Sequence, residues 1–226
     1  MNPLLASNAA LVYDSAMETA RTIAEVRRAV AAARGAGATI HLVPTMGALH
    51  EGHRSLLRAA RADGRLVVAS IFVNPTQFGP GEDFERYPRP VEADLDICRK
   101  DGVDLVFLPG VAEMYPPDSR THVHVAGLTE RLCGAHRPGH FDGVTTVVLK
   151  LFNIVQPDAA YFGQKDGQQA AVIRRMVADL DLPIDVVVCP TVRDSDGVAL
   201  SSRNAYLEPD ERTRARCLIE ALRLGE

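Results

Sequence analysis

The stretch Val43-Pro-Thr-Met-Gly-Ala-Leu-His-Glu-Gly-His53 decides how this chain is built. An apolar run that includes Ile40 and Leu42 leads into it and predicts a buried strand. In residues 54–61, which follow it, apolar side chains recur at helical spacing. The stretch therefore predicts a strand, a glycine-containing turn and the start of a helix. Such a junction directs unpaired backbone N–H groups and the positive end of a helix dipole toward one point, which suits a phosphate group.

His50 and His53 lie three residues apart on one side of the first turn of this helix. Each neutral imidazole can donate a hydrogen bond to a phosphate oxygen without like-charge repulsion. A zinc-protease helix has the pattern His-Glu-x-x-His, with its ligands four residues apart, and this chain does not have it. We therefore expect a phosphate site rather than a metal site. A pair of ordinary surface histidines at a helix start is the alternative.

Strand-like and helix-like segments alternate through most of the chain. Predicted strands cover residues 39–43, 66–73, 104–108, 159–162 and 184–189, and predicted helices cover residues 22–34, 51–62, 91–100, 144–155 and 167–180. The strands are rich in Val, Ile and Leu without polar alternation, as in parallel sheets that are buried on both faces. The pattern predicts an α/β fold, a doubly wound, Rossmann-like parallel sheet with helices on both faces.

The alternation of strands and helices stops near the end of the chain. From Glu208-Pro-Asp-Glu-Arg212 onward it reads as a helix rich in Arg, Leu and Ala that is still running at Glu226. We expect residues 1–191 to form the Rossmann-like nucleotide-binding domain. Residues 192–226 are expected to be a linker and the first part of a truncated C-terminal lid domain that is mostly missing.

Composition excludes several classes of protein. The formal net charge of −4 over 226 residues argues against a nucleic-acid partner, which would need a basic face. Four cysteines without a Cys-x-x-Cys pair favour reduced thiols in a cytosolic protein. No apolar run approaches the roughly 20 residues of a membrane span, and the N-terminus does not read as a signal peptide. We therefore expect a cytoplasmic protein with no nucleic-acid and no membrane partner.

Four polar loops follow predicted strands, at the sheet edge where open α/β folds bind ligands. They are residues 46–53, residues 74–78, residues 163–166, and residues 190–193 with residues 199–204. Lys165 can offset negative charge on a phosphate, although a Lys165–Asp166 pair that caps a turn is the alternative. Leu200-Ser-Ser-Arg-Asn204 offers two hydroxyls and a guanidinium on a loop that could close over a triphosphate, or it is simply a helix-entry loop. No Gly-x-Gly-x-x-Gly follows a strand, which argues against a dinucleotide.

Neutral amides complete the predicted site. Gln77 and Gln169 can hold a hydroxyl or a carboxylate without acting as catalysts. The matching chemistry is attack of a carboxylate on the α-phosphorus of a nucleoside triphosphate, with pyrophosphate leaving, which needs alignment and charge stabilisation rather than a protein nucleophile. Most of the mid-chain residues Arg89, Arg131, Arg137, His136 and His140 are expected to lie in solvated loops. His122 and His124 are expected to alternate along one face of a strand, at the surface.

Six motifs resemble the pantoate–β-alanine ligases, a family in the His-x-Gly-His nucleotidylyltransferase superfamily. The resemblance runs from about Pro44 through Leu207 and includes, in the family's order, Pro-Thr-Met-Gly-Ala-Leu-His-Glu-Gly-His, Val-Asn-Pro-x-Gln-Phe, Tyr-Pro-Arg, His-Phe-x-Gly-Val-x-Thr-Val-Val, Lys-Asp-x-Gln-Gln and Ser-Ser-Arg-Asn. It implies ATP-dependent ligation of pantoate to β-alanine through a pantoyl-adenylate, with Mg²⁺, in a homodimer.

The resemblance also implies residue roles. His53 would be the catalytic proton donor and His50 its partner, with Lys165, Ser201, Ser202 and Arg203 as further catalytic residues. ATP would be bound by Met46, Gly47, Ala48, Leu49, His50, Glu51, Gly52, His53, Gly163, Gln164, Lys165, Asp166, Val192, Leu200, Ser201, Ser202 and Arg203. Gln77 would contact pantoate and the incoming β-alanine, Gln169 would contact pantoate, and Asp94 would be associated with Mg²⁺.

This chain departs from the family pattern at Gln164, Gly167 and Leu200, where the family usually has Glu, an aromatic residue and Met. The largest departure is its end at Glu226, where the resemblance implies a further, smaller C-terminal domain that covers the site. Two alternatives therefore stay open. One is another His-x-Gly-His nucleotidylyltransferase that acts on a phosphorylated substrate, although Gln77 and Gln169 stand where a phosphate would favour Arg or Lys. The other is a nucleotide-binding fragment that is inactive for lack of its lid domain.

Overall fold

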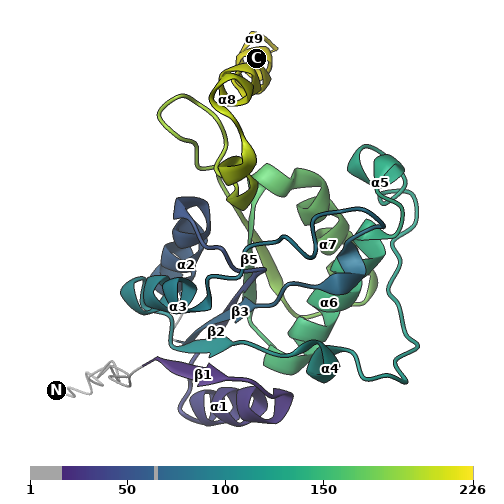
Figure 1. Cartoon of the computed structure of the whole chain (residues 1–226). Coiled ribbons are helices and arrows are strands. Elements are labelled where there is room, and N and C mark those ends of the chain that lie inside the picture. Colours follow the sequence, from purple (N-terminus) through teal and green to yellow (C-terminus); the bar gives the residue numbers. More distant parts are fainter. Residues whose placement is uncertain (1–16, 64–65, 226) are drawn as a thin grey trace, which may run out of the picture.

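A parallel sheet organises the chain (Figure 1). Within residues 17–63 and 66–225, the ranges that the computed structural model describes, six strands pair in the order β1-β4-β3-β2-β5-β6, every pair parallel. The strands are β1 (Glu18–Ala20), β2 (Ile40–Thr45), β3 (Leu66–Ile71), β4 (Leu105–Phe107), β5 (Ala159–Gly163) and β6 (Asp185–Cys189). The α-helices are α1 (Ile23–Gly35), α2 (Glu51–Asp63), α3 (Val91–Lys100), α4 (Val111–Met114), α5 (Cys133–His136), α6 (His140–Val155), α7 (Gly167–Asp179), α8 (Pro209–Ala215) and α9 (Cys217–Leu224). The short 3₁₀ helices are η1 (Pro75–Gln77), η2 (Gln164–Asp166) and η3 (Ser202–Tyr206).

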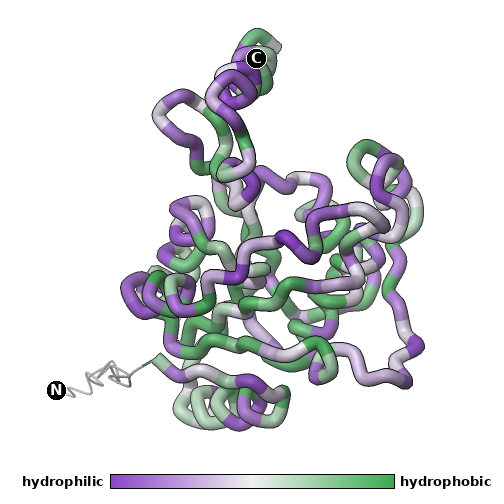
Figure 2. The backbone as a smooth tube through the Cα atoms, in the orientation of Figure 1, coloured by the Kyte–Doolittle hydropathy of each residue, from purple (hydrophilic) through white to green (hydrophobic). Residues whose placement is uncertain are grey.

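Helices cover both faces of the sheet, as the alternating pattern predicts. Helices α1, α6 and α7 contribute buried side chains to the core on one face, and α2 and α3 contribute them on the other. All six residues of β3 are buried, which is why that strand shows no polar alternation. Figure 2 shows hydrophobic residues along the central strands and hydrophilic stretches in the surrounding loops. The doubly wound α/β prediction is confirmed.

Three local features differ from the sequence prediction. Strand β1 is missing from that prediction because three residues at a sheet edge are too short to show a period. Helix α6 begins at His140, four residues before the predicted start. His122 and His124 are exposed, as expected, but no strand carries them. Instead, the Val123 N–H donates to Thr146 Oγ1 at 2.9 Å, and the Val123 carbonyl accepts from Thr145 Oγ1 at 2.6 Å. Hydroxyls of α6 thus take the place of a strand partner.

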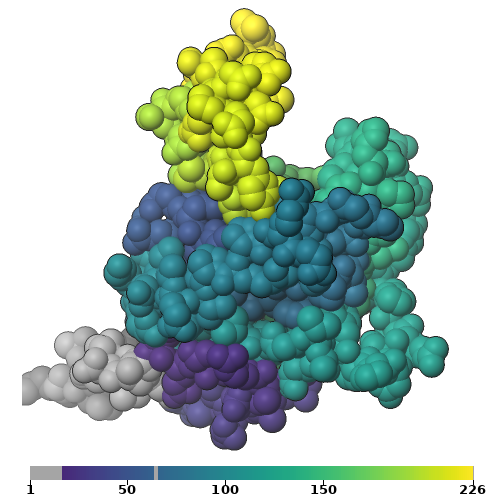
Figure 3. Space-filling view, viewed as in Figure 1, coloured from purple at the N-terminus to yellow at the C-terminus, as the bar shows by residue number. Residues whose placement is uncertain are grey.

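Beyond β6 the chain leaves the α/β body. Helices α8 and α9 contain no buried residue and project from the same end of the molecule as α5 (Figures 1 and 3). Arg212 of α8 contacts Asp194 at 2.6 Å and Asp196 at 2.8 Å, so these helices are attached to the segment between β6 and η3.

None of the helices found in residues 17–63 and 66–225 combines the length and the apolar character that a membrane span needs.

Candidate functional site

A cavity of about 250 Å³ opens at the carboxyl ends of β2, β3, β5 and β6. This is the edge at which the polar loops were expected to meet. Its deeper wall is apolar and comes from the sheet and α6, and includes Phe72, Val144, Val148 and Phe162. Its rim is polar and comes from the start of α2, the start of α7 and the segment after β6. The cavity therefore joins an apolar floor to a rim of hydrogen-bond donors and cations.

The two histidines of the His-x-Gly-His stretch lie in this rim, with their ring centroids 4.1 Å apart. The Gly52 backbone N–H donates to His50 Nδ1 at 3.1 Å, and the His50 backbone N–H donates to His53 Nδ1 at 3.3 Å. A ring nitrogen that accepts a hydrogen bond carries no proton, so these bonds assign the proton of each neutral ring to Nε2. Each imidazole thus has its Nε2–H available to a ligand.

Both rings are neutral near pH 7. Burial lowers the pKa of His50, and the Lys165 ammonium lowers it further. Burial lowers the pKa of His53 to about 3, with smaller contributions from His50 and Lys165. A neutral ring of this kind acts as a hydrogen-bond donor, as the sequence suggested. The proton-donor role that the resemblance gave to His53 stays a prediction.

Lys165 follows β5 and lines the cavity together with His50 and His53. Its Nζ is 3.3 Å from Asp166 Oδ1, and its side chain is 38% exposed. Both residues line the cavity, so the pair is more than the cap of a turn. An exposed pair of this kind adds little to stability, which leaves the ammonium able to exchange Asp166 for a phosphate.

Asp94 of α3 holds the loop between β2 and α2. Its two carboxylate oxygens accept the backbone N–H groups of Ala48 and Leu49 at 2.9 and 2.7 Å. Gly47 has a φ of +80°, and a Cβ there would lie 2.8 Å from Asp94 Oδ2, so only glycine fits this turn. Burial raises the pKa of Asp94, against the effect of the two N–H donors.

The magnesium role that the resemblance gave to Asp94 stays a prediction, but the geometry gives this carboxylate a different task. The residue is 1% exposed and both oxygens already accept hydrogen bonds. In the ranges that the structure describes, no three His, Cys, Asp or Glu side chains come together as a metal-binding group. Asp94 therefore acts as a structural acceptor for this loop, and its oxygens would have to exchange these hydrogen bonds to hold magnesium.

Gln77 is positioned by close contact between η1 and α6. A Cβ on Gly143 of α6 would lie 2.3 Å from the Thr76 carbonyl oxygen, so glycine lets the two backbones touch. Asn74 Nδ2 donates to both the Gly143 carbonyl and Gln77 Oε1 at 3.1 Å. Gln77 Nε2 in turn donates to Met46 Sδ at 2.9 Å, and both residues line the cavity. The amide is therefore fixed before any ligand binds.

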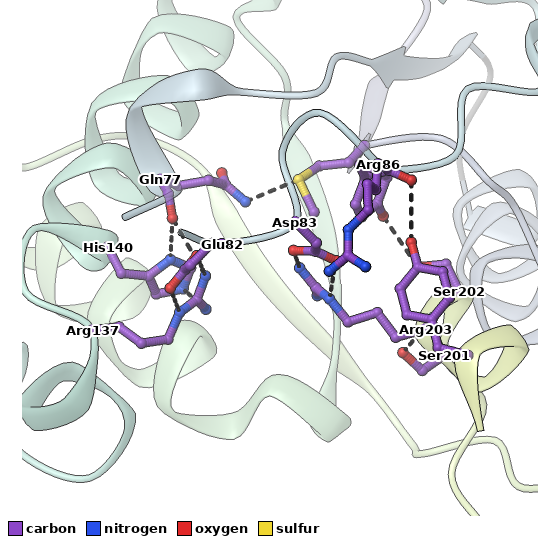
Figure 4. Close-up of polar contacts among 12 residues, drawn as sticks. Gln77, Glu82, Asp83, Arg86, Arg137, His140, Ser201, Ser202 and Arg203 are labelled. Carbon is purple, nitrogen blue, oxygen red and sulfur yellow. Dashed lines mark hydrogen bonds and ion pairs between the residues drawn. The ribbon is translucent and has the colours of Figure 1, made fainter. Parts of the chain in front are cut away.

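Arg137 and His140 both contact the backbone carbonyl of Gln77 (Figure 4). His140 Nδ1 donates to the Gln77 carbonyl at 2.7 Å, and Arg137 contacts His140 Nε2 at 3.1 Å. Because the guanidinium only donates, His140 Nε2 accepts, and the ring is neutral. Burial is the main reason that the pKa of His140 is lowered. Glu82 accepts two hydrogen bonds from Arg137, at 2.7 and 2.5 Å.

Arg203 forms a matching pair on the other side of the cavity. Its Nε and Nη2 both donate to Asp83 at 2.8 Å, and its guanidinium lies 5.6 Å from the centroid of the Tyr87 ring. The Tyr87 hydroxyl lies 3.2 Å from Ser202 Oγ. Neighbouring carboxylates, those of Glu82 and Asp83, thus hold two arginines that line the cavity (Figure 4).

Most of the predicted site residues come together in the cavity wall. They are Met46, His50, Gly52, His53, Gln77, Gly163, Lys165, Asp166, Gln169, Val192, Leu200, Ser201, Ser202 and Arg203. The wall does not include Gly47, Ala48, Leu49, Glu51, Gln164 or Asp94. Glu51 instead pairs with Arg54 and Arg58 on the outer surface of α2.

Sequence reasoning missed several residues of this wall. Arg137 and His140 were expected in solvated loops with their neighbours. This was wrong for these two, because the turn between α5 and α6 and the early start of α6 bring them against the Gln77 carbonyl. Asn74 and Tyr87 also line the cavity; Asn74 lies in a predicted polar loop but was given no role, and Tyr87 was not a candidate. The signal available for Asn74 was its place directly before Pro75 in the predicted polar loop of residues 74–78.

Comparisons with known proteins agree with this arrangement. The model of the family described as pantoate–β-alanine ligase matches residues 18–226. The chain belongs to the pantoate–β-alanine ligase family.

Two curated members of the family are close relatives. Pantothenate synthetase from Moorella thermoacetica is 65% identical over 209 residues, which cover 92% of this chain and 74% of that relative. Pantothenate synthetase from Syntrophotalea carbinolica is 59% identical, over 92% of this chain and 73% of that relative.

Solved structures of the family have the same fold. Pantothenate synthetase from Thermus thermophilus is 54% identical, with a TM-score of 0.86 over 91% of this chain and 73% of that one. The Francisella tularensis pantoate–β-alanine ligase, solved as a complex with β,γ ATP and β-alanine, is 38% identical, with a TM-score of 0.84 over 92% of this chain and 80% of that one.

Proposed function

We propose that this chain ligates pantoate to β-alanine at the expense of ATP, through a pantoyl-adenylate. The observation that carries the proposal is the pair of neutral imidazoles at the start of α2, whose Nδ1 atoms accept backbone N–H groups and whose Nε2–H groups remain available. Two such donors and the Lys165 ammonium can contact the phosphates of ATP. The family and the relatives reported above support the same reaction.

The first half-reaction needs no protein nucleophile. A carboxylate oxygen of pantoate attacks the α-phosphorus, the bond between that phosphorus and the bridging oxygen to the β-phosphorus breaks, and pyrophosphate leaves with the electron pair. Charge grows on the phosphate oxygens during this step, so donors fixed beforehand lower its barrier. His50, His53 and Lys165 supply them, and Ser201, Ser202 and Arg203 add further donors from the segment after β6.

The second half-reaction is the attack of the β-alanine amine on the acyl carbon of the adenylate. The new C–N bond replaces the acyl–oxygen bond, AMP leaves with the electron pair, and the amine loses its proton. The Gln77 amide lines the cavity, where it can hold pantoate and guide the amine. The apolar floor, with Phe72, Val144 and Phe162, suits the dimethyl carbon of pantoate.

Three further properties are part of the proposal. Mg²⁺ enters with ATP as part of the substrate, because Mg²⁺ commonly binds through substrate phosphates. The chain works as a homodimer, as the family resemblance implies, and light scattering would measure its mass in solution. It acts in the cytoplasm, where its substrate ATP is made and kept.

The deciding experiment is exchange of labelled pyrophosphate into ATP with pantoate and Mg²⁺ present and β-alanine absent. Exchange that depends on pantoate is expected, because adenylate formation is reversible. ATP binding without exchange would favour a nucleotide-binding fragment. Exchange that requires a phosphorylated acceptor instead of pantoate would favour another nucleotidylyltransferase.

A further inference from the structure

The side chain of Gln77 is oriented by Asn74, the residue that precedes η1. Asn74 is 1% exposed. Its Oδ1 accepts the Thr76 backbone N–H at 3.3 Å, and its Nδ2 donates to the Gly143 carbonyl at 3.1 Å. A backbone N–H only donates and a carbonyl only accepts, so these two contacts determine which end of the Asn74 amide is the oxygen. The Nδ2 atom also contacts the Gln77 amide, at 3.1 Å, and the atom that it contacts must be Oε1.

The NH2 group of Gln77 is therefore the end of the amide that remains for the cavity. Its Nε2 donates to Met46 Sδ at 2.9 Å, and both residues line the cavity. An amide NH2 group has two hydrogens, and this contact uses one of them. Gln77 thus meets a ligand as a hydrogen-bond donor, which suits an oxygen atom of an acid substrate.

Tyr115 holds the oxygen end of Asn74 from a distant part of the chain. It follows α4, and its hydroxyl donates to Asn74 Oδ1 at 2.9 Å. Burial raises the pKa of Tyr115, so the hydroxyl keeps its proton and donates at neutral pH. Tyr115 is not one of the described residues that line the cavity. Its hydroxyl can therefore act on a ligand only through Asn74 and Gln77.

The aromatic ring of Tyr115 is itself fixed by its neighbours. Its centroid lies 6.2 Å from that of the Phe72 ring and 5.7 Å from Lys150 Nζ. The ring also packs against the hydrophobic core on the α6 side of the sheet. A short chain of hydrogen bonds thus runs from this ring through Asn74 to Gln77, and its first member is anchored in the body of the protein.

We propose that Tyr115 is a positioning residue: through Asn74 it holds the Gln77 amide with its NH2 group turned to the cavity. This inference rests on the proposed function, in which Gln77 contacts pantoate. A side chain that is already ordered loses less conformational entropy when the substrate binds. Without the Tyr115 hydroxyl, Asn74 Oδ1 loses a donor, and both amides rotate more freely.

Kinetics of Tyr115→Phe, which removes the hydroxyl and keeps the ring, test the effect on the reaction. We expect the KM for pantoate in pyrophosphate exchange to rise about 3- to 10-fold, the effect of one neutral hydrogen bond. The kcat and the KM for ATP should change less than about twofold, because the variant weakens binding of the acid and leaves the phosphate donors in place. An equal rise in the KM for ATP would indicate general disruption of the site and would overturn the inference.

A double-mutant cycle tests whether Tyr115 acts through Gln77. In the Gln77→Ala background, Tyr115→Phe should lower kcat/KM for pantoate by less than about a further twofold, because the amide that the hydroxyl positions is gone. Equal fold losses in the two backgrounds would give Tyr115 a role independent of Gln77 and would contradict the inference.

Nuclear magnetic resonance of the free protein gives a readout that needs no turnover. With isotope-labelled glutamine, the side-chain amide signals of Gln77 are assigned by their loss in Gln77→Ala. Tyr115→Phe should shift these signals and speed the exchange of their hydrogens with water. Thr129→Val is the matched control, because it removes another buried hydroxyl, one that donates to the Val125 carbonyl at 2.9 Å. Both variants should lower the melting temperature, but the control should leave the Gln77 signals and the KM for pantoate unchanged.

The outcomes separate this inference from the proposed function. Unchanged Gln77 signals in Tyr115→Phe would overturn the inference, whatever the kinetics. Shifted signals with an unchanged KM for pantoate would also overturn it, since the orientation of the amide would then not matter to the reaction. Shifted signals in a protein whose wild type shows no pantoate-dependent exchange would overturn the proposed function, while the hold of Tyr115 on Gln77 would stand.

Discussion

At His50 and His53, two backbone N–H groups determine which ring nitrogen carries the proton. The spacing of the histidines could be read from the sequence, and so could their value as neutral donors. The tautomer could not, because it depends on how the first turn of α2 bends its N–H groups onto the Nδ1 atoms. The donors are therefore set by the backbone, and a substitution at either position removes a preorganised donor rather than a mobile one.

Replacing either histidine by alanine should reduce catalysis strongly. His50→Ala and His53→Ala are each expected to lose about 2–4 kcal/mol of transition-state stabilisation, the effect of removing one preorganised donor. Pantoate-dependent pyrophosphate exchange measures the loss, and the exposed His124→Ala serves as a control. Exchange by His53→Ala at the wild-type rate would show that this ring does not contact the reacting phosphates.

The low pKa of His53 should also appear in the pH dependence of stability. The pKa is about 3 in the folded state, against 6.5 for an unperturbed histidine side chain. Between these values the unfolded chain binds more protons than the folded one, so the free energy of unfolding falls as the pH is lowered. Denaturant unfolding between about pH 4 and pH 6 should show a slope that His53→Asn reduces by up to about 1.4 kcal/mol per pH unit. An unchanged slope would mean that His53 titrates alike in both states.

Among the elements, the contact between α6 and η1 sets the position of Gln77. The sequence predicts both segments, but it starts α6 four residues late and so misses the residues that touch η1. The apolar run from Val144 to Val155 marks most of α6, whereas its first turn has a single large apolar residue, the buried Phe141, between His140 and Asp142 and so shows no apolar period. For the same reason Arg137 and His140 read as loop residues until the packing of this turn is known.

Two glycine-to-alanine changes should have opposite effects. A Cβ on Gly143 would lie 2.3 Å from the Thr76 carbonyl oxygen and 2.6 Å from the Gln77 backbone nitrogen. The backbones of α6 and η1 would therefore have to separate. We expect a loss of about 1–3 kcal/mol in the free energy of unfolding and a lower kcat/KM for pantoate. Gly167, at the start of α7, has helical φ and ψ, and a Cβ there would meet nothing within 4 Å. Gly167→Ala should therefore raise the free energy of unfolding by about 0.4–1 kcal/mol. Chemical denaturation checks both, and equal effects would contradict the packing argument.

In the whole molecule, two parts of the chain build one cavity. The α/β body supplies His50, His53 and Lys165, and the segment after β6 supplies Leu200 to Arg203. The order of these motifs along the sequence predicted that they would meet, because the carboxyl ends of parallel strands share one edge. The contacts that join the two parts could not be predicted, since they depend on an irregular loop whose Asp83 and Tyr87 contact Arg203 and Ser202.

The segment from Val192 to Leu207 is joined to the α/β body by contacts of Arg203, Ser202 and Tyr206 with the loop that carries Asp83, Arg86 and Tyr87. We propose, as the predicted domain division at residues 191 and 192 implies, that it opens more readily than the sheet. η3 has no buried residue, and the Arg203 side chain is 43% exposed. A ligand that binds only the closed form reduces this opening in proportion to its saturation.

Hydrogen exchange with and without nucleotide tests the dependence. A non-hydrolysable β,γ analogue of ATP should slow amide exchange in residues 192–207, because its terminal phosphates can contact both Lys165 of the body and Arg203 of the segment. AMP is the matched control, since it has the same base, ribose and α-phosphate but cannot bridge the two parts. Protection by the triphosphate alone is therefore expected. Equal protection by AMP would place the contact at the α-phosphate, and no protection by either would mean that Arg203 stays with Asp83 and does not take part in nucleotide binding.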